Sequence, residues 1–514
     1  MSRSVGLALV AVVYLLLFPY HPGLRSPNEL VRLHQTRALV EFRSLELDQA
    51  LKTYGRVGDL AQHDGHFYSS KAPLLSFAAV PIYAWLSWLG GGGPAAVGEV
   101  ELVFWTRLFL TVLPSLWLLW LLRRFLRTRL PDRITDAVLV TYALGSLALS
   151  YSTLFMSHQP SAVLLFACFF ALWRVGRGDW RARGTILAGV AAGAAVATEY
   201  TAALGVLALV VYGALDVLLR DEPWPERLRL LGRRFGLALL GALPFILALG
   251  AYHQAAFGHP LESAYLHLAD AAYQPWHLGG FLGIRTPDPQ AFALSFFGAL
   301  RGLFVLAPFL LLALPGLWLL PREGREAKAI LAFTVLLLLG YTYFTSSFSY
   351  ASWGWTTGPR HLTGLVPFLL LPVGSTLRWL QDRWKELGLA VAAGLCAASI
   401  LITGALSCVN YIPDDVSSPL FGLVVPLWMQ GALPPTTLSV FGAPNLIAAL
   451  PVLVALPLAS LWVVWRLSPR LLPSALALLT VALVIALHAL LAQHTRADAD
   501  AVRFLASVWL TGTG

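Results

Sequence analysis

Charged residues are scarce in this chain of 514 residues: they make up only 12% of it, whereas hydrophobic residues make up 57%. Soluble domains carry about 25% charged residues, so a set of soluble domains is excluded. Cysteine is also scarce. The three cysteines all lie in or at the end of apolar runs, which excludes a disulfide framework. The formal net charge of +9 is typical of basic loops in a membrane protein, and we expect no nucleic-acid partner.

Motifs for nucleotides and metals are missing as well. No glycine-rich phosphate loop follows a predicted strand, so a soluble nucleotide-sugar domain is not expected. No group of His and Cys residues has zinc-ligand spacing, so we predict no metal ligands, and the use of a divalent cation is left open. The sequence has no internal repeat, which counts against a transporter.

Apolar runs recur along almost the whole chain. Each is roughly 16–22 residues long, close to the ~20 residues that a helix needs to cross a bilayer. They are rich in Leu, Ala and Val without period-two alternation, which favours helices over a barrel. We therefore predict an all-α polytopic membrane protein that forms one domain over residues 1–514. The thirteen predicted spans lie near 5–20, 101–122, 134–152, 161–175, 185–199, 201–219, 236–253, 303–320, 329–346, 363–379, 388–409, 446–465 and 471–491.

Lys and Arg in the short loops predict the orientation. The clusters follow every second span, so a cytoplasmic N-terminus places all of them in the cytoplasm. They lie at 123–133, 174–183, 220–234, 322–328, 378–385 and 466–470. The first apolar run has no small-x-small cleavage site before His21, so we interpret it as an uncleaved span.

The apolar run 73–89 is interpreted differently from the spans. Counting it as a span would invert the side on which the basic clusters lie. It also contains Pro81 and is followed by four glycines at 90–93. We therefore predict a helix that lies at the outer membrane interface or is re-entrant.

The polar residues are distributed unevenly between the two sides of the membrane, and the first outer loop holds an unusual share of them. The largest outer segment is the first loop, 21–100, followed by the loops 254–302 and 410–445 and the tail 492–514. Groups available for chemistry are therefore expected on the extracytoplasmic side.

The first loop opens with a predicted helix. Pro27 suits the first helical position and Ser26 the cap before it. Glu29 and Arg32 are one turn apart on this helix, just above the membrane. They are either functional groups or an ordinary surface ion pair.

A second polar cluster, His63 to Leu74, lies immediately before the predicted interfacial helix. Its Lys71 is placed to meet an anionic headgroup, since a compact ammonium suits phosphate. The alternative is that Lys71 only snorkels from the end of that helix.

Three further positions carry polar groups at the ends of spans. His158 lies in a short outer turn, where a lone His is most often structural. Glu199 ends a Gly/Ala-rich span, and is either functional or a solvated helix terminus. The segment 353–362 combines aromatic residues, two glycines and the pair Arg360 and His361. Arg360 suits bidentate binding of phosphate, and Arg301 is a weaker candidate for the same role.

Four of these motifs, in this order, resemble those of the GT-C integral-membrane glycosyltransferases, in the bacterial branch of protein O-mannosyltransferases and the lipid A aminoarabinose transferase. Pro-Asn-Glu-Leu-Val-Arg at 27–32 resembles the acidic motif of that family, and Tyr-Ser-Ser-Lys-Ala-Pro at 68–73 its Tyr-x-x-Lys-x-Pro motif. Thr-Glu-Tyr at 198–200 and Gly-Pro-Arg-His-Leu at 358–362 resemble two further stretches.

The resemblance implies roles for these residues. Glu29 becomes the catalytic base and Lys71 the ligand of the donor phosphate, with Tyr68, Arg301 and Arg360 lining the donor site. Arg32, His158, Glu199 and His361 are further substrate-binding candidates. One departure affects the base: Asn28 stands where the family usually has Asp, and an amide is no useful proton acceptor. Asp48, Asp59 and Asp64 are therefore alternative bases, with Asp64 taken as a catalytic candidate beside Glu29.

The implied function is transfer of a sugar to an extracytoplasmic acceptor. Direct displacement by a single base inverts the anomeric configuration, so we expect an inverting transferase. The implied donor is a polyprenyl-phosphate-linked sugar, and the acceptor a lipid, glycan or protein. The implied location is the inner membrane of a bacterium, with the site on its outer side. A transporter or flippase of a lipid-linked glycan, a glycan ligase or polymerase, and a non-catalytic scaffold are the alternatives.

Overall fold

The computed structural model describes all residues except 1–2, 22–23, 25, 92, 94–95, 281–282, 321–323, 349–353 and 512–514. Arg322 and Trp353, which belong to two predicted motifs, lie outside the described residues. The described chain is predominantly helical, which confirms the predicted all-α polytopic class. Its one small sheet is a two-stranded hairpin in the first loop.

The transmembrane part begins with α1 and continues from α5 to α12. The bounds are α1 Arg3–Leu16, α5 Glu99–Arg107, α6 Leu113–Leu126, α7 Asp132–Leu144, α8 Leu147–Ser152, α9 His158–Gly176, α10 Arg181–Thr198, α11 Ala202–Leu218 and α12 Trp224–Phe257. The later helices are α15 Leu303–Leu306, α16 Ala313–Leu319, α17 Arg325–Ser347, α18 Val366–Val409, α21 Asn445–Leu467 and α22 Leu471–Leu491.

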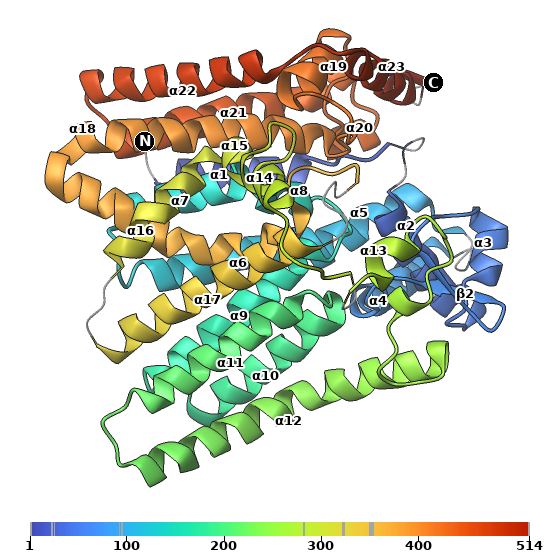
Figure 1. Cartoon of the computed structure of the whole chain (residues 1–514). Helices are drawn as coiled ribbons and strands as arrows, with labels where there is room; N and C mark the ends of the chain where they lie inside the picture. The colour runs from blue at the N-terminus through green and yellow to red at the C-terminus, as the bar shows by residue number, and fades with distance from the viewer. Residues whose placement is uncertain are drawn as a thin grey trace.

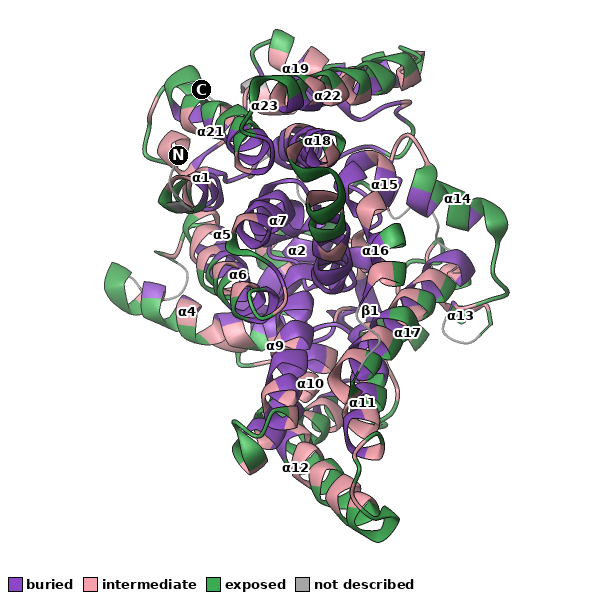
Figure 2. Ribbon diagram, turned by 90° about the vertical axis from the view of Figure 1, so that its left-hand side faces the viewer, coloured by how far each residue is buried: buried purple, intermediate pink, exposed green. Residues whose placement is uncertain are grey.

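Each of the thirteen predicted spans coincides with helix in the structure. The predicted spans 363–379 and 388–409 both fall in α18, which turns at Lys385, where φ is 51°. Within the described residues, seven helices are long and apolar enough to cross a membrane, and five shorter apolar helices accompany them. Two of the long ones, α12 and α22, have apolar windows that are only 11% buried, so their side chains are available to lipid (Figure 2).

Close helix packing depends on glycine between α10 and α12. A Cβ atom at Gly189 would lie 1.9 Å from the carbonyl oxygen of Ala238, and one at Gly241 would lie 2.1 Å from that of Ile186. Small residues at such crossings allow backbones to approach, as in other membrane helices. This contact fixes the long helix α12 against α10, the helix that Glu199 follows.

The two ends of the helical bundle differ in character (Figure 1). The basic loops lie at one end, where acidic side chains bind them together: buried Asp216 contacts Arg220, Arg234 and Arg325. At the other end lie the first-loop elements and the short helices α13 Gln274–Leu278, α19 Val425–Met429, α20 Thr437–Val440 and α23 Arg496–Thr511. This segregation agrees with the predicted alternation of loops, while the side that faces the cytoplasm stays a prediction.

The first loop contains α2 Pro27–Arg37, α3 Asp48–Tyr54, strands β1 Leu60–His63 and β2 His66–Ser69, and α4 Leu74–Gly90. Helix α2 begins at Pro27 as predicted, although Ser26 makes no side-chain cap bond. Helix α4 covers the run predicted as interfacial, and its Trp88 is 76% exposed. Its position relative to a bilayer stays a prediction.

The hairpin was not predicted. Asp64 and Gly65 form its turn with φ of 48° and 85°, the positive values that a tight type I′ turn requires. The antiparallel register pairs Leu60 with Ser69, and one step further the Ser70 amide donates to the Asp59 carbonyl at 3.0 Å. The register therefore brings Asp59 beside Lys71 at the base of the hairpin.

Candidate active site

An ion pair between Asp59 and Lys71 forms the centre of the candidate site. The Lys71 Nζ atom lies 3.0 Å from Asp59 Oδ1, and the two side chains are 11% and 24% exposed. Asp59 has a φ of 59°, a left-handed conformation that Asp tolerates better than most residues. The pair is thus held by the hairpin and still reachable from outside.

The guanidinium groups of Arg32 and Arg360 add positive charge near the Asp59–Lys71 pair. Arg32 on α2 is 2% exposed, and its acceptors are all neutral: Asn28 Oδ1, the Ala72 carbonyl and Ser157 Oγ. Arg360 lies close enough to act electrostatically on both Asp59 and Lys71, as does Arg32. The Nε atom of Arg360 is buried with no hydrogen-bond partner among the described residues. Buried positive charge of this kind suits an anionic ligand.

The pKa values of the pair follow from this surplus of cations. Burial raises the pKa of Asp59, but Lys71, Arg360 and Arg32 together outweigh burial and leave it below its ordinary value. Burial lowers the pKa of Lys71, and the nearby Arg360 and Arg32 lower it further, so Asp59 does not restore it fully. The ammonium therefore gains from any additional negative charge that binds beside it.

Aromatic groups from the loop 254–302 adjoin the ion pair. The rings of Tyr265 and His277 stack with centroids 4.5 Å apart and planes 2° from parallel. Burial and the charge of Lys71 lower the pKa of His277 to about 4, so its imidazole is neutral at pH 7. Burial, Glu199 and Asp59 raise the pKa of Tyr265 to about 12. A neutral stacked surface beside a cationic centre suits the apolar face of a sugar ring.

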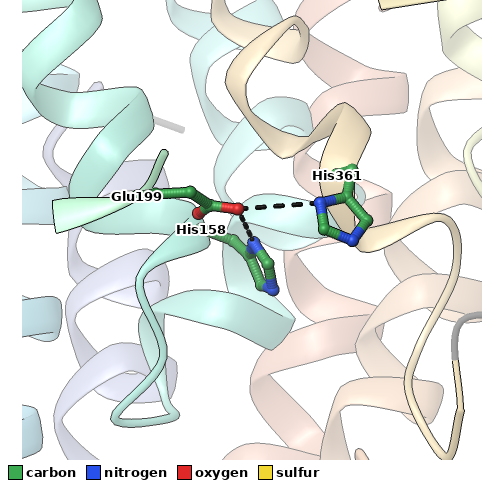
Figure 3. Close-up of side chains that lie close together, drawn as sticks. All are labelled: His158, Glu199 and His361. Atoms are coloured by element: carbon green, nitrogen blue, oxygen red, sulfur yellow. Dashed lines mark hydrogen bonds and ion pairs between the residues drawn. The ribbon is translucent and has the colours of Figure 1, made fainter. Parts of the chain in front are cut away.

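A third group of side chains is His158, Glu199 and His361 (Figure 3). Glu199 Oε1 lies 2.9 Å from His158 Nδ1 and 3.6 Å from His361 Nδ1. The three residues come from the start of α9, the residue after α10 and the short helical turn Arg360–Gly364. Arg32 and Arg360 act electrostatically on His158, which places the triad next to the cationic centre.

Glu29 lies in a different environment from that predicted. Its carboxylate binds Arg107 in bidentate fashion, with Nε–Oε1 and Nη2–Oε2 distances of 3.1 and 2.9 Å. It also accepts from the Tyr411 hydroxyl at 2.8 Å and from the Phe155 amide. The alternative of a surface ion pair with Arg32 is wrong, since both residues are buried and Glu29 pairs with Arg107. The catalytic role of Glu29 stays a prediction.

The other predicted residues are distributed over the same end of the molecule. Asp64 is 86% exposed at the hairpin turn, 3.5 Å from His63, and Tyr68 packs its ring against Phe257. Arg301 is buried, and its Nη2 donates to the Ile412 carbonyl at 3.4 Å. Lys71, Arg32, Arg360, His158, Glu199 and His361 are the predicted residues that the structure brings together. Sequence reasoning missed Tyr265 and His277, which no local pattern distinguishes from other loop aromatics.

The fold can be compared with known proteins. No protein-family model and no curated protein sequence matches the chain. Among solved structures it is similar to ArnT from Cupriavidus metallidurans bound to undecaprenyl phosphate, with 14% identity, a TM-score of 0.49, and coverage of 93% of this chain and 76% of that one. It is also similar to the arabinosyltransferase EmbB from Mycobacterium smegmatis, with 13% identity, a TM-score of 0.46, and coverage of 95% and 40%.

A third similar structure is the oligosaccharyltransferase AglB from Archaeoglobus fulgidus in complex with an inhibitory peptide and a dolichol-phosphate. The identity is 11%, the TM-score 0.44, and the coverage 84% of this chain and 58% of that one. All three are GT-C membrane glycosyltransferases, the group that the motifs resemble. TM-scores below 0.5 carry no information on substrate or mechanism, which must come from the site itself.

Proposed function

We propose that this chain is a membrane-embedded glycosyltransferase that uses a polyprenyl-phosphate-linked sugar as donor. The observation that supports this most is the largely buried cationic centre, in which Arg32 and Arg360 act on the Asp59–Lys71 pair. Within the described residues, neither guanidinium has an ion pair with a carboxylate. The cations Lys71, Arg32 and Arg360 and the carboxylates Asp59 and Glu199 together have a net charge of about +1, which one further negative charge would neutralise. The phosphate of a lipid-linked donor, entering from the bilayer, supplies it.

The chemistry needs positive charge where the phosphate leaves and a base near the acceptor hydroxyl. Lys71, Arg32 and Arg360 stabilise the departing phosphate. Asp59 takes the proton of the acceptor, because it is ionised, partly exposed and fixed beside Lys71. The ammonium of Lys71 thus lies between the donor phosphate and the base. One displacement of this kind inverts the anomeric configuration, and the acceptor is a lipid, glycan or protein outside the inner membrane of a bacterial cell.

The donor site is tested with Lys71→Ala and Arg360→Ala. Each change removes a charge-assisted hydrogen bond to phosphate, worth about 1.5–3 kcal/mol, so the KM for donor should rise about 10- to 100-fold. The measurement is transfer of radiolabelled sugar from a panel of polyprenyl-phosphate donors by protein reconstituted in lipid. The matched controls are Lys52→Ala and Arg56→Ala, which alter exposed cations of the same loop.

An unchanged donor KM in both variants would contradict the assignment of the phosphate site. Donor binding without transfer to any acceptor, together with movement of the labelled lipid between leaflets, would favour a flippase.

The alkaline limb of the pH profile is a second test. Lys71 must be protonated to hold phosphate, and its pKa is below the ordinary 10.5, so kcat/KM should fall with an apparent pKa below 10.5. Tyr265 does not titrate in this range, since its pKa is about 12. In Lys71→Arg the limb should move to higher pH, because guanidinium stays charged. If the wild type and Lys71→Arg lost activity at the same alkaline pH, a group other than Lys71 would be responsible for the alkaline limb.

A further inference from the structure

The side chains of His158, Glu199 and His361 converge on one point in the interior of the protein. Glu199 Oε1 already accepts from His158 Nδ1 and from Thr201 Oγ1, both at 2.9 Å. His361 Nδ1 lies 3.6 Å from the same oxygen. Two imidazoles therefore converge on one buried carboxylate oxygen.

The separation of 3.6 Å between His361 and Glu199 is that of two ligands around one metal ion, and the 2.9 Å between His158 and Glu199 is shorter by a few tenths of an ångström. Ligands at about 2.0–2.2 Å from a tetrahedral ion lie roughly 3.3–3.6 Å from one another. In the triad, one ligand atom from each residue lies within 4.8 Å of the other two. Figure 3 shows that both imidazoles present Nδ1 to the carboxylate, so small movements would place all three atoms around a common point.

The donor set is chemically specific. Two imidazole nitrogens and one carboxylate oxygen suit Zn²⁺ and other divalent first-row ions, and three protein ligands leave a position open. All three side chains are largely buried, with 4%, 10% and 14% of the His158, Glu199 and His361 side chains exposed. The residues come from three segments of the chain, so the site exists only in the folded protein.

We propose that His158, Glu199 and His361 form a binding site for one divalent transition-metal ion of the Zn²⁺ class. The open position of the ion is available to water or to a phosphate oxygen, since Arg360 directly precedes His361 and belongs to the cationic centre. The ion site stands on its own geometry. Only its action on the donor phosphate rests on the proposed function.

The test is metal binding by the purified full chain in detergent. Protein stripped with EDTA is incubated with ZnCl₂, desalted, and analysed for zinc per chain by mass spectrometry. We expect one equivalent in the wild type, and background levels in His158→Ala and His361→Ala. Co²⁺ in place of Zn²⁺ should give visible d–d absorption in the wild type, which the same variants lose. Size exclusion and the thermal midpoint check that the variants are folded.

The matched control is His66→Ala, because His66 belongs to a more exposed group with Glu46 and Asp48, each 3.4 Å away. This variant should retain the full equivalent of zinc. Zinc that is lost in His66→Ala and kept in His158→Ala would overturn the proposal, as would a wild type that binds none. Undiminished transfer by metal-free protein would overturn the action of the ion on the donor phosphate, whereas bound metal without transfer from any donor would overturn only the transferase.

Discussion

Asp59→Asn is expected to lower kcat by about 10²- to 10⁴-fold, the usual contribution of a general base. The amide keeps the shape of the side chain and loses its ability to accept a proton. The substitution also removes the negative charge 3.0 Å from Lys71, so the ammonium becomes more available to phosphate. The KM for donor should therefore stay unchanged or fall. Steady-state kinetics with reconstituted protein measure both quantities.

Asp48 and Asp64 provide the controls, because they lie in the same loop. Asp64 is 86% exposed at the hairpin turn, and Asp48 contacts His66. Asp48→Asn and Asp64→Asn should retain kcat within a few-fold. If Asp64→Asn lost activity and Asp59→Asn kept it, the base would be Asp64, which the sequence analysis named as a catalytic candidate beside Glu29. A rise in donor KM with unchanged kcat in Asp59→Asn would mean that the residue only positions Lys71.

The helical spans were predictable because each depends on a local property, a run of about 20 apolar residues. The alternation of basic loops depends on composition alone, and the structure gathers those loops at one end (Figure 1). The hairpin was missed, although Asp64–Gly65 is the strongest short signal for a tight turn. Recognising it would have paired Leu60 with Ser69 and placed Asp59 beside Lys71.

The site was predictable only in part, because side-chain partners are decided by tertiary contacts. Arg32, Lys71 and Arg360 were identified from charge near the membrane surface, and they do act on one another. The ligands of the proposed ion site are separated too widely for a spacing motif: His158 and Glu199 alone are 41 positions apart. The partner of Glu29 is Arg107, 78 residues away at the beginning of a span, where no pattern marked it.

Glu29→Gln is expected to destabilise the protein by about 3–5 kcal/mol, the cost of leaving a buried charge without its partner. Arg107 is 3% exposed and Glu29 7%, so water does not compensate the guanidinium. The carboxylate also joins α2 to Tyr411 and to the Phe155 amide, so three separate parts of the chain lose a common acceptor. The measurement is the midpoint of thermal unfolding in detergent, compared with that of Asp59→Asn.

The double variant Glu29→Gln/Arg107→Met distinguishes structure from catalysis. It removes both charges, and replacement of a buried pair is often nearly neutral, so stability should recover relative to Glu29→Gln. Activity per folded molecule should then stay near that of the wild type. In the wild type, both carboxylate oxygens of Glu29 already accept hydrogen bonds, so Glu29 is not available to take a proton. A stable double variant without activity would restore Glu29 as the base. The same carboxylate cannot serve both functions at once: an oxygen that holds Arg107 and Tyr411 in place must release one of them before it can receive a proton.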